Sequence, residues 1–271
     1  MEDGLIYHYT DASGLLGIAK SGKLWLTDVT YMNDRRELDY GIEVLREALK
    51  PRLSALQRAA ALNPGEESPE GNISRVIGGV ISELSRMLKP DDPGFRVFAA
   101  CFCEEGDLLS QWRGYAKGVG GFSLGFDPDI LARDKGGASP LVKVAYGPSE
   151  AQSLIEAIMP RIAPQPTGHP GAHAYTQAEQ IVPIIARIKH PGFREEREHR
   201  LIHRYWGRGG GDLRATDSGL VSYVERPFDI NAIRRIIVGP SADDRNLRAA
   251  YDLANSVGKG IEVVRSAIPF R

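Results

Sequence analysis

The sequence predicts an α+β fold in a single domain of 271 residues, and three observations lead to that prediction. Short apolar runs typical of strands recur along the whole chain, and glycine-containing turns separate them. Amphipathic helical segments fall between these runs at irregular spacing, which disfavours the regular alternation of a doubly wound sheet. Helix-rich stretches at about 40–90 and 149–190 interrupt the strand pattern. We therefore expect helical lobes inserted into a sheet core.

The expected strands are rich in β-branched and aromatic residues and are bounded by turn signals. They are 5–9, 23–27, 95–103, 121–126, 141–147, 197–206, 220–226, 233–239 and 261–266. The continuous apolar run at 95–103 is typical of a strand buried on both faces. The run at 197–206 also fits a charged helix with (i, i+4) ion pairs. Its apolar pair followed by Tyr205 and Trp206 favours a strand.

The expected helices carry an apolar stripe at helical spacing. They are 14–20, 35–62, 73–88, 110–115, 149–162, 176–189 and 244–257. Asp11 or Ser13 can cap the first of these helices, and Gly22 can end it. Pro51 lies inside the second helix and removes a backbone donor, so we expect a break at that point.

Composition excludes several classes of protein. The apolar fraction of 42% and the charged fraction of 25% are ordinary for a globular chain, and the net charge of −1 disfavours a protein that is basic all over. No apolar stretch is long enough for a membrane helix, and the acidic N-terminus does not resemble a secretory signal. Cys101 and Cys103 lack the partners for a zinc site and are badly placed for a mutual disulfide. We expect a cytoplasmic protein without a metal or a membrane partner.

The first group of candidate functional residues lies at the N-terminus. His8 stands between Tyr7 and Tyr9, and Thr10 follows. In a strand, His8 faces the side opposite to both tyrosines. Such a histidine can hydrogen-bond a sugar hydroxyl or a carboxylate; the alternative is a structural histidine bonded to the backbone.

The second group lies in the segment 108–116. Ser110, Trp112 and Tyr115 fall within about one helical turn of each other. Trp112 or Tyr115 can stack on a planar ligand ring. The alternative interpretation makes Trp112 a core residue and Arg113 a solvated surface group.

The third group consists of Glu196, Glu198 and Arg200, which alternate along the chain. In a strand all three side chains lie on one face. A carboxylate there can orient a sugar hydroxyl, stabilise an oxocarbenium ion or act as a base. The alternative is a helix in which Glu196 and Arg200 form a surface ion pair.

Several blocks of the sequence, taken in order, resemble a bacterial family described only as a domain of unknown function, DUF2971. These blocks are "YHYT" with the following "GLLGIAKSGKLWLTDVTYMNDRRE", then "FAACFCEE", "LLSQWRGYAKG", "GFSLGFD", "REEREHRLI" and "IRRIIVGP". The opening block also resembles the start of ADP-ribosyltransferases of the DNA-modifying toxin kind. That superfamily has a histidine on the first strand, an aromatic or hydroxyl residue on a middle strand and a glutamate on a late strand.

This second resemblance implies an ADP-ribosyltransferase-like sheet core, mixed or antiparallel, that uses NAD as a substrate. It implies that His8 holds a ribose hydroxyl and that Tyr115, or Ser110, takes the middle position. Tyr115 or Trp112 packs on the nicotinamide. Glu198 bonds the 2′-hydroxyl of the nicotinamide ribose.

The same resemblance leaves Glu195 and Glu196 as alternatives to Glu198, and it gives Asn33 and Arg200 roles in positioning and in binding the pyrophosphate. The expected partner is a macromolecular target, either protein, DNA or RNA, in a toxin or phage-defence setting. Two other functions stay open at this point. One is a non-catalytic nucleotide- or peptide-binding module of a defence or stress system, and the other is a metal-dependent nuclease that uses Glu196 and Glu198.

Overall fold

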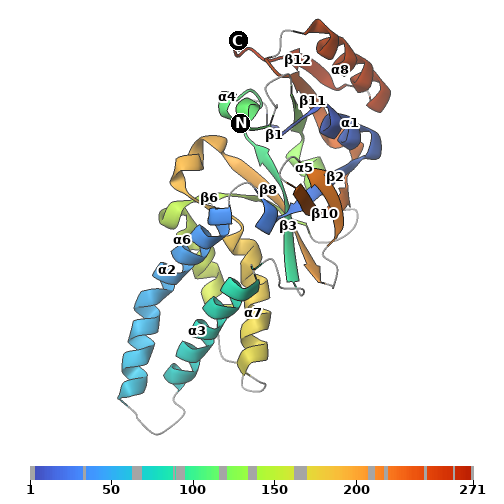
Figure 1. Cartoon of the computed structure of the whole chain (residues 1–271). Coiled ribbons are helices and arrows are strands. Elements are labelled where there is room, and N and C mark those ends of the chain that lie inside the picture. The colour runs from blue at the N-terminus through green and yellow to red at the C-terminus, as the bar shows by residue number, and fades with distance from the viewer. Residues whose placement is uncertain are drawn as a thin grey trace.

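A computed structural model gives the fold of the chain (Figure 1). It describes residues 4–32, 35–62, 69–87, 89, 95–115, 121–133, 139–161, 170–206, 211–216, 219–240, 243–258 and 260–269. These residues form a mixed sheet with helices, which confirms the α+β class. Helices α2, α3 and α7 extend together away from the sheet, while α1 and α8 lie beside its other end (Figure 1).

The elements of the described residues are as follows. The strands are β1 (Ile6–Thr10), β2 (Lys23–Asp28), β3 (Phe95–Cys103), β4 (Phe122–Phe126), β5 (Leu141–Lys143), β6 (Ala145–Tyr146), β7 (Ile188–Lys189), β8 (Glu198–Trp206), β9 (Asp212–Thr216), β10 (Gly219–Pro227), β11 (Ile233–Val238) and β12 (Glu262–Arg265). The α-helices are α1 (Ala12–Ser21), α2 (Arg35–Ala61), α3 (Pro69–Met87), α4 (Leu109–Tyr115), α5 (Pro128–Ala132), α6 (Gly147–Ile158), α7 (Pro170–Ile185) and α8 (Asp244–Val257). The short 3₁₀ helices are η1 (Val29–Tyr31), η2 (Met159–Arg161), η3 (Pro191–Glu196) and η4 (Ile230–Ala232).

Local sequence signals explain where the first helix begins and ends. The side chain of Asp11, rather than Ser13, accepts a hydrogen bond from the backbone N–H of Gly14 at 2.8 Å and caps α1. Gly22 follows the helix in the left-handed conformation with φ of 63°, which glycine adopts without steric cost. This turn leads the chain directly into β2, so β1, α1 and β2 form one compact unit.

The expected break at Pro51 is wrong, because α2 runs through it as one helix. Leu45 and Leu49 before the proline are buried, and Leu53 and Leu56 after it pack against the same apolar cluster. Pro51 itself is exposed. Packing on both sides of the proline therefore stabilises the helical path although one backbone hydrogen bond is lost.

Two other expectations are corrected nearby. The helix expected at 176–189 ends at Ile185, and Lys189 instead lies in the short strand β7, which pairs in parallel with β6. The strand expected at 141–147 divides into β5 and β6. Strand β9 was not expected, because it is short and mostly exposed and carries little strand signal.

The sheet changes its pairing partners along β3. One edge of β3 pairs with β8 along its whole length. On the other edge, Cys103 pairs with Tyr7 of β1, whereas Ala99 and Phe98 pair with Thr27 and Asp28 of β2. Strand β1 continues the sheet through β4, β11 and β12, and β2 continues it through β10 and β9. The junction between these two parts therefore lies beside Cys101.

Apolar clusters cover the sheet on different sides. Along β3, Val97 and Ala99 join the cluster formed with α2, α3, α6 and α7, whereas Phe98 and Phe102 join a second cluster with α1 and α8. A third, smaller cluster near α4 contains Cys103 and the two tyrosines of β1. Among the described residues, no helix has both the length and the apolar character required to cross a membrane.

Candidate functional site

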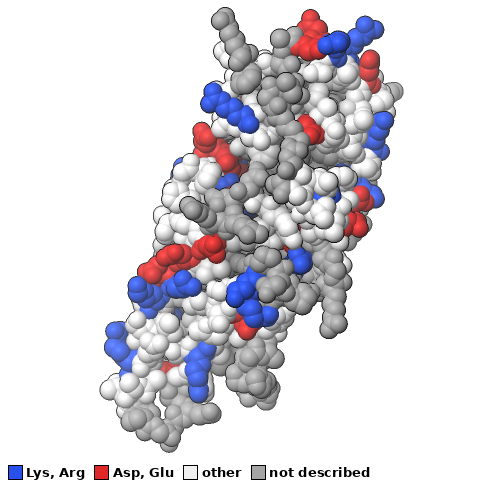
Figure 2. All heavy atoms as spheres, viewed as in Figure 1, with Lys and Arg blue, Asp and Glu red and all other residues white. Residues whose placement is uncertain are grey.

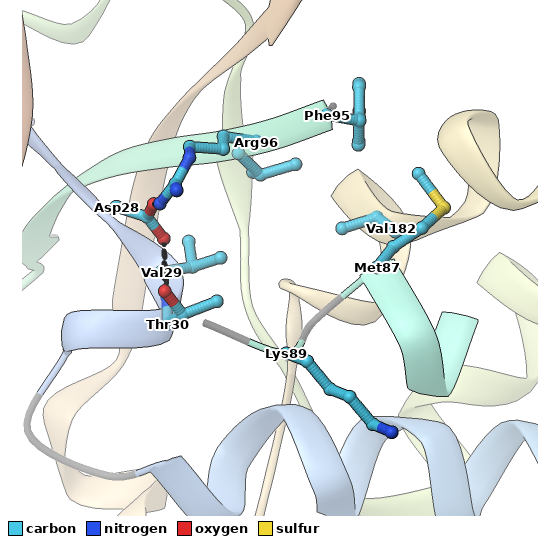
Figure 3. Close-up of a pocket in the computed structure, with 9 residues that line it drawn as sticks. Asp28, Val29, Thr30, Met87, Lys89, Phe95, Arg96 and Val182 are labelled. Atoms are coloured by element: carbon cyan, nitrogen blue, oxygen red, sulfur yellow. Dashed lines mark hydrogen bonds and ion pairs between the residues drawn. The ribbon is translucent and has the colours of Figure 1, made fainter. Parts of the chain in front are cut away.

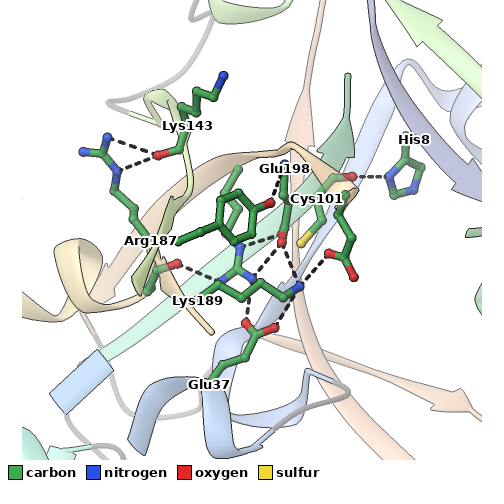
Figure 4. A network of polar contacts seen from close by, with 11 residues as sticks. His8, Glu37, Cys101, Lys143, Arg187, Lys189 and Glu198 are labelled. Atoms are coloured by element: carbon green, nitrogen blue, oxygen red, sulfur yellow. Dashed lines mark hydrogen bonds and ion pairs between the residues drawn. The ribbon is translucent and has the colours of Figure 1, made fainter. Parts of the chain in front are cut away.

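The candidate site lies where β3 exchanges β1 for β2. We call it the junction site and define it as His8, Cys101, Tyr115, Glu196 and Glu198. The Cys101 carbonyl faces the gap between the two partner strands and bonds Nδ1 of His8 at 2.9 Å. Figure 4 shows Cys101 between His8 on one side and a network of charged side chains on the other.

The contact with the Cys101 carbonyl determines the form of His8. A carbonyl oxygen only accepts hydrogen bonds, so Nδ1 of His8 carries the proton and donates it. Burial lowers the pKa of His8; the bond to Cys101 opposes this effect, and the positive charge of Arg214 adds to it. His8 is therefore neutral near pH 7, and its Nε2 is an acceptor.

Glu198 and Arg200 form the centre of the charged network, and only 2% and 1% of these residues is exposed. Nε of Arg200 donates to Oε1 of Glu198 at 2.6 Å, and Nη2 donates to Oε2 at 3.1 Å. Arg200 also donates to the Ala186 carbonyl at 2.7 Å and to Oε2 of Glu37 at 2.6 Å. All three guanidinium nitrogens are thus engaged within the protein.

Lys189 joins the carboxylates of three different elements (Figure 4). Its Nζ lies 2.9 Å from Oε1 of Glu37, 2.7 Å from Oε2 of Glu196 and 3.0 Å from Oε2 of Glu198. Three carboxylates against two cations leave one negative charge in excess. Because the groups are buried together, this excess is screened little by solvent.

The two glutamates of β8 and η3 have different environments. Burial alone would raise the pKa of Glu198, but Arg200 and Lys189 outweigh it and hold that pKa at about 2. Burial raises the pKa of Glu196, against the effect of Lys189. The side chain of Glu196 is 19% exposed, compared with 3% for Glu198. Glu196 is therefore the carboxylate that a ligand can reach.

Backbone pairing places Cys101 against this network. Cys101 is opposite Arg200, and Cys103 is opposite Glu198, in the antiparallel pair of β3 and β8. Burial raises the pKa of Cys101 well above its usual value, and the neighbouring charge of Glu198 adds to this rise. The thiol is therefore protonated at neutral pH and packs as a small, weakly polar side chain.

Tyr115 ends α4 and is 43% exposed. Burial of its hydroxyl end raises its pKa, and the negative charges at Glu198 and Glu196 raise it further. The hydroxyl thus remains protonated and lies on the acidic side of the junction site. A phenol in this position can donate a hydrogen bond, and its ring presents an exposed apolar surface.

Several other predicted residues form structural contacts instead. Tyr9 donates to the Glu105 carbonyl at 2.8 Å and accepts from the Leu108 N–H at 2.9 Å. Tyr7 accepts from Arg235 at 2.9 Å. Trp112 is 2% exposed and packs edge-on against Tyr9, so it is not in position to stack on a ligand. Burial thus engages these residues within the protein, and their expected role as ligand contacts stays a prediction.

The remaining predicted residues have varied positions. Arg200 is enclosed by its ion pairs with Glu37 and Glu198, and its expected contact with a pyrophosphate stays a prediction. Thr10 ends β1 opposite Phe122, and Ser110 is exposed at the start of α4. Asn33 lies outside the described residues.

The alternation along the chain predicts Glu196, Glu198 and Arg200 on one strand face, and the structure changes part of this prediction. Glu198 and Arg200 do share a face of β8, but Glu196 ends η3 before the strand begins. The 3₁₀ helix nevertheless directs Glu196 to Lys189. The side-chain alternation therefore failed, whereas the proximity of the two glutamates is confirmed.

Cys101 of the junction site, and Glu37 and Lys189 of the charged network beside it, were not predicted from the sequence as functional residues. Lys189 follows an apolar run, and a lone lysine there gives a weak signal of a buried ion pair. Glu37 lies 163 residues from Arg200, and no local pattern connects them. Only the packing of α2 against β7 and β8 reveals this set.

The geometry also bears on a metal site. Nζ of Lys189 lies between the carboxylates of Glu196 and Glu198, where a bridging divalent cation would have to bind. A metal would therefore have to displace this ammonium group. Across the described residues, no group of three or more acidic, histidine or cysteine side chains is arranged to hold a metal ion.

A separate small pocket lies near the other end of β3 (Figure 3). Asp28 lines it, is 1% exposed, and accepts hydrogen bonds from Arg96 and from the Thr30 hydroxyl at 2.8 and 2.7 Å. Met87 and Val182 from the helical lobe form its opposite wall. The Asp28 carboxylate is thus committed to holding the turn after β2, and we assign it no ligand.

One comparison with known proteins gives a match. The family model described as "Protein of unknown function (DUF2971)" matches residues 111–201. This match confirms the resemblance to DUF2971. The matched region runs from α4 to the first half of β8, so it contains Tyr115, Lys189, Glu196 and Glu198. The His8 side of the junction site lies outside the matched DUF2971 region. No curated protein and no solved structure matches the chain.

Proposed function

We propose that this protein is an ADP-ribosyltransferase that binds NAD at the junction site and transfers ADP-ribose to a macromolecule. The observation that supports this most is the proximity of three groups distant in sequence. Neutral His8 from β1 meets Cys101, Cys101 packs against Glu198, and Tyr115 lies in the field of both glutamates. The N-terminal resemblance and this geometry point to the same three kinds of side chain.

Each group has a role that suits its environment. Nε2 of His8 accepts a hydrogen bond from a ribose hydroxyl, because Nδ1 already donates to the backbone. The exposed ring of Tyr115 packs on the nicotinamide. Glu196 faces the ribose, since its side chain is the more exposed of the two carboxylates. Glu198 acts as a positioning residue that fixes Lys189 and Arg200.

The chemistry is the cleavage of the glycosidic bond of NAD. The bond between the ribose carbon and the nicotinamide nitrogen breaks, and its electron pair leaves with neutral nicotinamide. The sugar acquires oxocarbenium character, which the Glu196 carboxylate stabilises. A nucleophile of the target then bonds to the same carbon and releases a proton. The network around Lys189 has one negative charge in excess, which suits such a cation.

The test is incubation of the protein with labelled NAD and with protein, DNA or RNA fractions. Wild-type protein is expected to label one fraction and to release nicotinamide. Glu196→Gln is expected to reduce this transfer by about 100-fold, because a charge contact to the transition state is lost. Glu195→Gln is the matched control, since Glu195 is exposed on the same 3₁₀ helix. The proposal would be refuted if the folded protein showed no label transfer and no release of nicotinamide.

Glu198→Ala is a poor test of catalysis because it would leave Arg200 and Lys189 buried with fewer partners. The saturated contacts of Glu198 also support a second candidate function, a non-catalytic nucleotide-binding module. In that case the protein binds NAD without releasing nicotinamide. The same labelling experiment, combined with calorimetric NAD binding, separates the two functions.

A further inference from the structure

We propose that Arg214 binds a phosphate or pyrophosphate group of a nucleotide at the His8 side of the junction site. The proposal rests on the proposed function, because it names the group that holds the anionic part of NAD. Arg214 lies on β9, outside the region that matches DUF2971.

Among the described residues Arg214 forms no ion pair, although the Asp11 carboxylate acts on its charge and opposes the larger lowering of its pKa by burial. Nη2 donates to the Thr27 hydroxyl at 2.9 Å. Nε is buried and has no hydrogen-bond partner in the described part of the chain. An arginine presents a planar fork of donors that matches the oxygens of a phosphate, so a bound phosphate would give Nε the acceptor that it lacks.

The surroundings of Arg214 suit a nucleotide. Its guanidinium lies 5.6 Å from the centre of the Trp25 ring, and Trp25 contacts Tyr223 with ring centres 4.6 Å apart. Trp25 is 43% exposed, so a large aromatic surface lies open to solvent beside the guanidinium of Arg214. Aromatic side chains beside a positive charge are a common arrangement for binding bases and phosphates.

The position of Arg214 relative to His8 connects it to the junction site. Its positive charge contributes to the lowered pKa of His8, after the larger effect of burial. Thr27, which holds Arg214, pairs with Ala99 of β3, two residues before Cys101. His8 thus lies within electrostatic range of Arg214 and bonds the Cys101 carbonyl beside the charged network.

This separation of charge matches the charge distribution of NAD. The network around Lys189 carries one excess negative charge, and Arg214 carries a positive charge that forms no ion pair among the described residues. NAD has a positive nicotinamide ring at one end and a negative pyrophosphate farther along. The nicotinamide therefore points to Glu196 and the pyrophosphate to Arg214. Arg200 does not take this role, because its nitrogens bond Glu37, Glu198 and the Ala186 carbonyl.

The test compares the binding of ADP and of adenosine by calorimetry. Arg214→Gln is expected to weaken ADP binding by about tenfold, since it removes charge-assisted hydrogen bonds, and to leave adenosine binding unchanged. Arg245→Gln is the matched control for charge, because Arg245 pairs with Asp243 at the start of the remote helix α8. Arg214→Lys retains the charge but not the fork and is expected to bind ADP with intermediate affinity.

The outcomes distinguish this inference from the proposed function. Arg214-dependent ADP binding without nicotinamide release from NAD would support the phosphate site and refute the transferase. Equal ADP affinity in wild type and Arg214→Gln would overturn the phosphate site, whatever the turnover of NAD. Binding of a short single-stranded oligonucleotide but not of ADP would overturn it in favour of a nucleic-acid surface.

A measurement on the unaltered protein covers the case in which Arg214→Gln does not fold. ADP binding by wild-type protein is expected to weaken as salt concentration rises, while binding of uncharged adenosine stays constant. ADP binding that does not respond to salt would overturn the phosphate site.

Discussion

Replacing Glu198 by glutamine tests whether the charged network stabilises the fold. The substitution keeps the shape of the side chain but removes its charge, so Arg200 and Lys189 lose their shared carboxylate. The pKa of Glu198 is held at about 2 from a usual value of 4.5, which corresponds to about 3 kcal/mol. Removal of one partner from a buried ion pair costs about 3–5 kcal/mol.

The lower end of that range applies here because neither cation is left alone. Arg200 keeps Glu37 at 2.6 Å, and Lys189 keeps Glu37 and Glu196 at 2.9 and 2.7 Å. We therefore expect Glu198→Gln to lower the free energy of unfolding by about 3 kcal/mol. Glu196→Gln is expected to lower it by about 1 kcal/mol, since a partly exposed ion pair contributes less.

The assay is urea unfolding followed by tryptophan fluorescence and by far-ultraviolet circular dichroism. Glu195→Gln serves as the control for the loss of one charge from the same segment and is expected to change the free energy of unfolding by less than about 0.5 kcal/mol. An unchanged slope against urea would show that the unfolded state is the same. A loss below about 1 kcal/mol in Glu198→Gln would refute the reasoning, because the network would then not be desolvated as its burial indicates.

Three further predictions follow from the same contacts. Because folding lowers the pKa of Glu198, its stabilising contribution is complete above pH 4.5 and is lost as the pH falls towards 2; thermal unfolding measured across this range should show a weaker acid destabilisation in Glu198→Gln than in wild type. Tyr9→Phe removes two buried hydrogen bonds, to Glu105 and Leu108, and is expected to lower the free energy of unfolding by about 1–3 kcal/mol; an unchanged urea midpoint would contradict this. Gly125→Ala would bring its methyl group 2.8 Å from the Tyr7 ring, and a loss of about 1–3 kcal/mol in urea unfolding is expected from overpacking; a variant as stable as wild type would show that β1 and β4 can separate.

The charge distribution over the surface is relevant to the target of the proposed transferase. Figure 2 shows basic and acidic side chains interspersed over one face of the described residues. With a net charge of −1, the chain does not have the overall positive charge typical of sequence-independent nucleic-acid binders. The labelling experiment with separate fractions therefore has to include protein targets as well as DNA and RNA.

Much of the secondary structure could be predicted because it depends on local signals. The run at 95–103 and the helix at 244–257 have the expected bounds in the structure. Asp11 and Gly22 mark the ends of α1 through capping and the left-handed turn. Predictions failed where packing outweighs local preference, as at Pro51, or where a short exposed strand shows little apolar pattern, as in β9.

The candidate site divides along the same physical line. The sequence by itself determined the residue types, because His8, Tyr115, Glu196 and Glu198 stand out by their neighbours and spacing. Only the tertiary structure decided which of them a ligand can reach: burial encloses Glu198 and Trp112 and leaves Glu196 and Tyr115 partly exposed.

Tertiary structure alone also supplied Glu37, Lys189 and Arg214. Their contacts join segments that are far apart in the chain, such as the 187 residues between Arg214 and Thr27. Local patterns carry information about neighbours within a few residues, whereas burial and charge pairing depend on which segments the whole sheet brings together. The structure therefore shows the environment of each ionisable group, and that environment determines its charge and its accessibility.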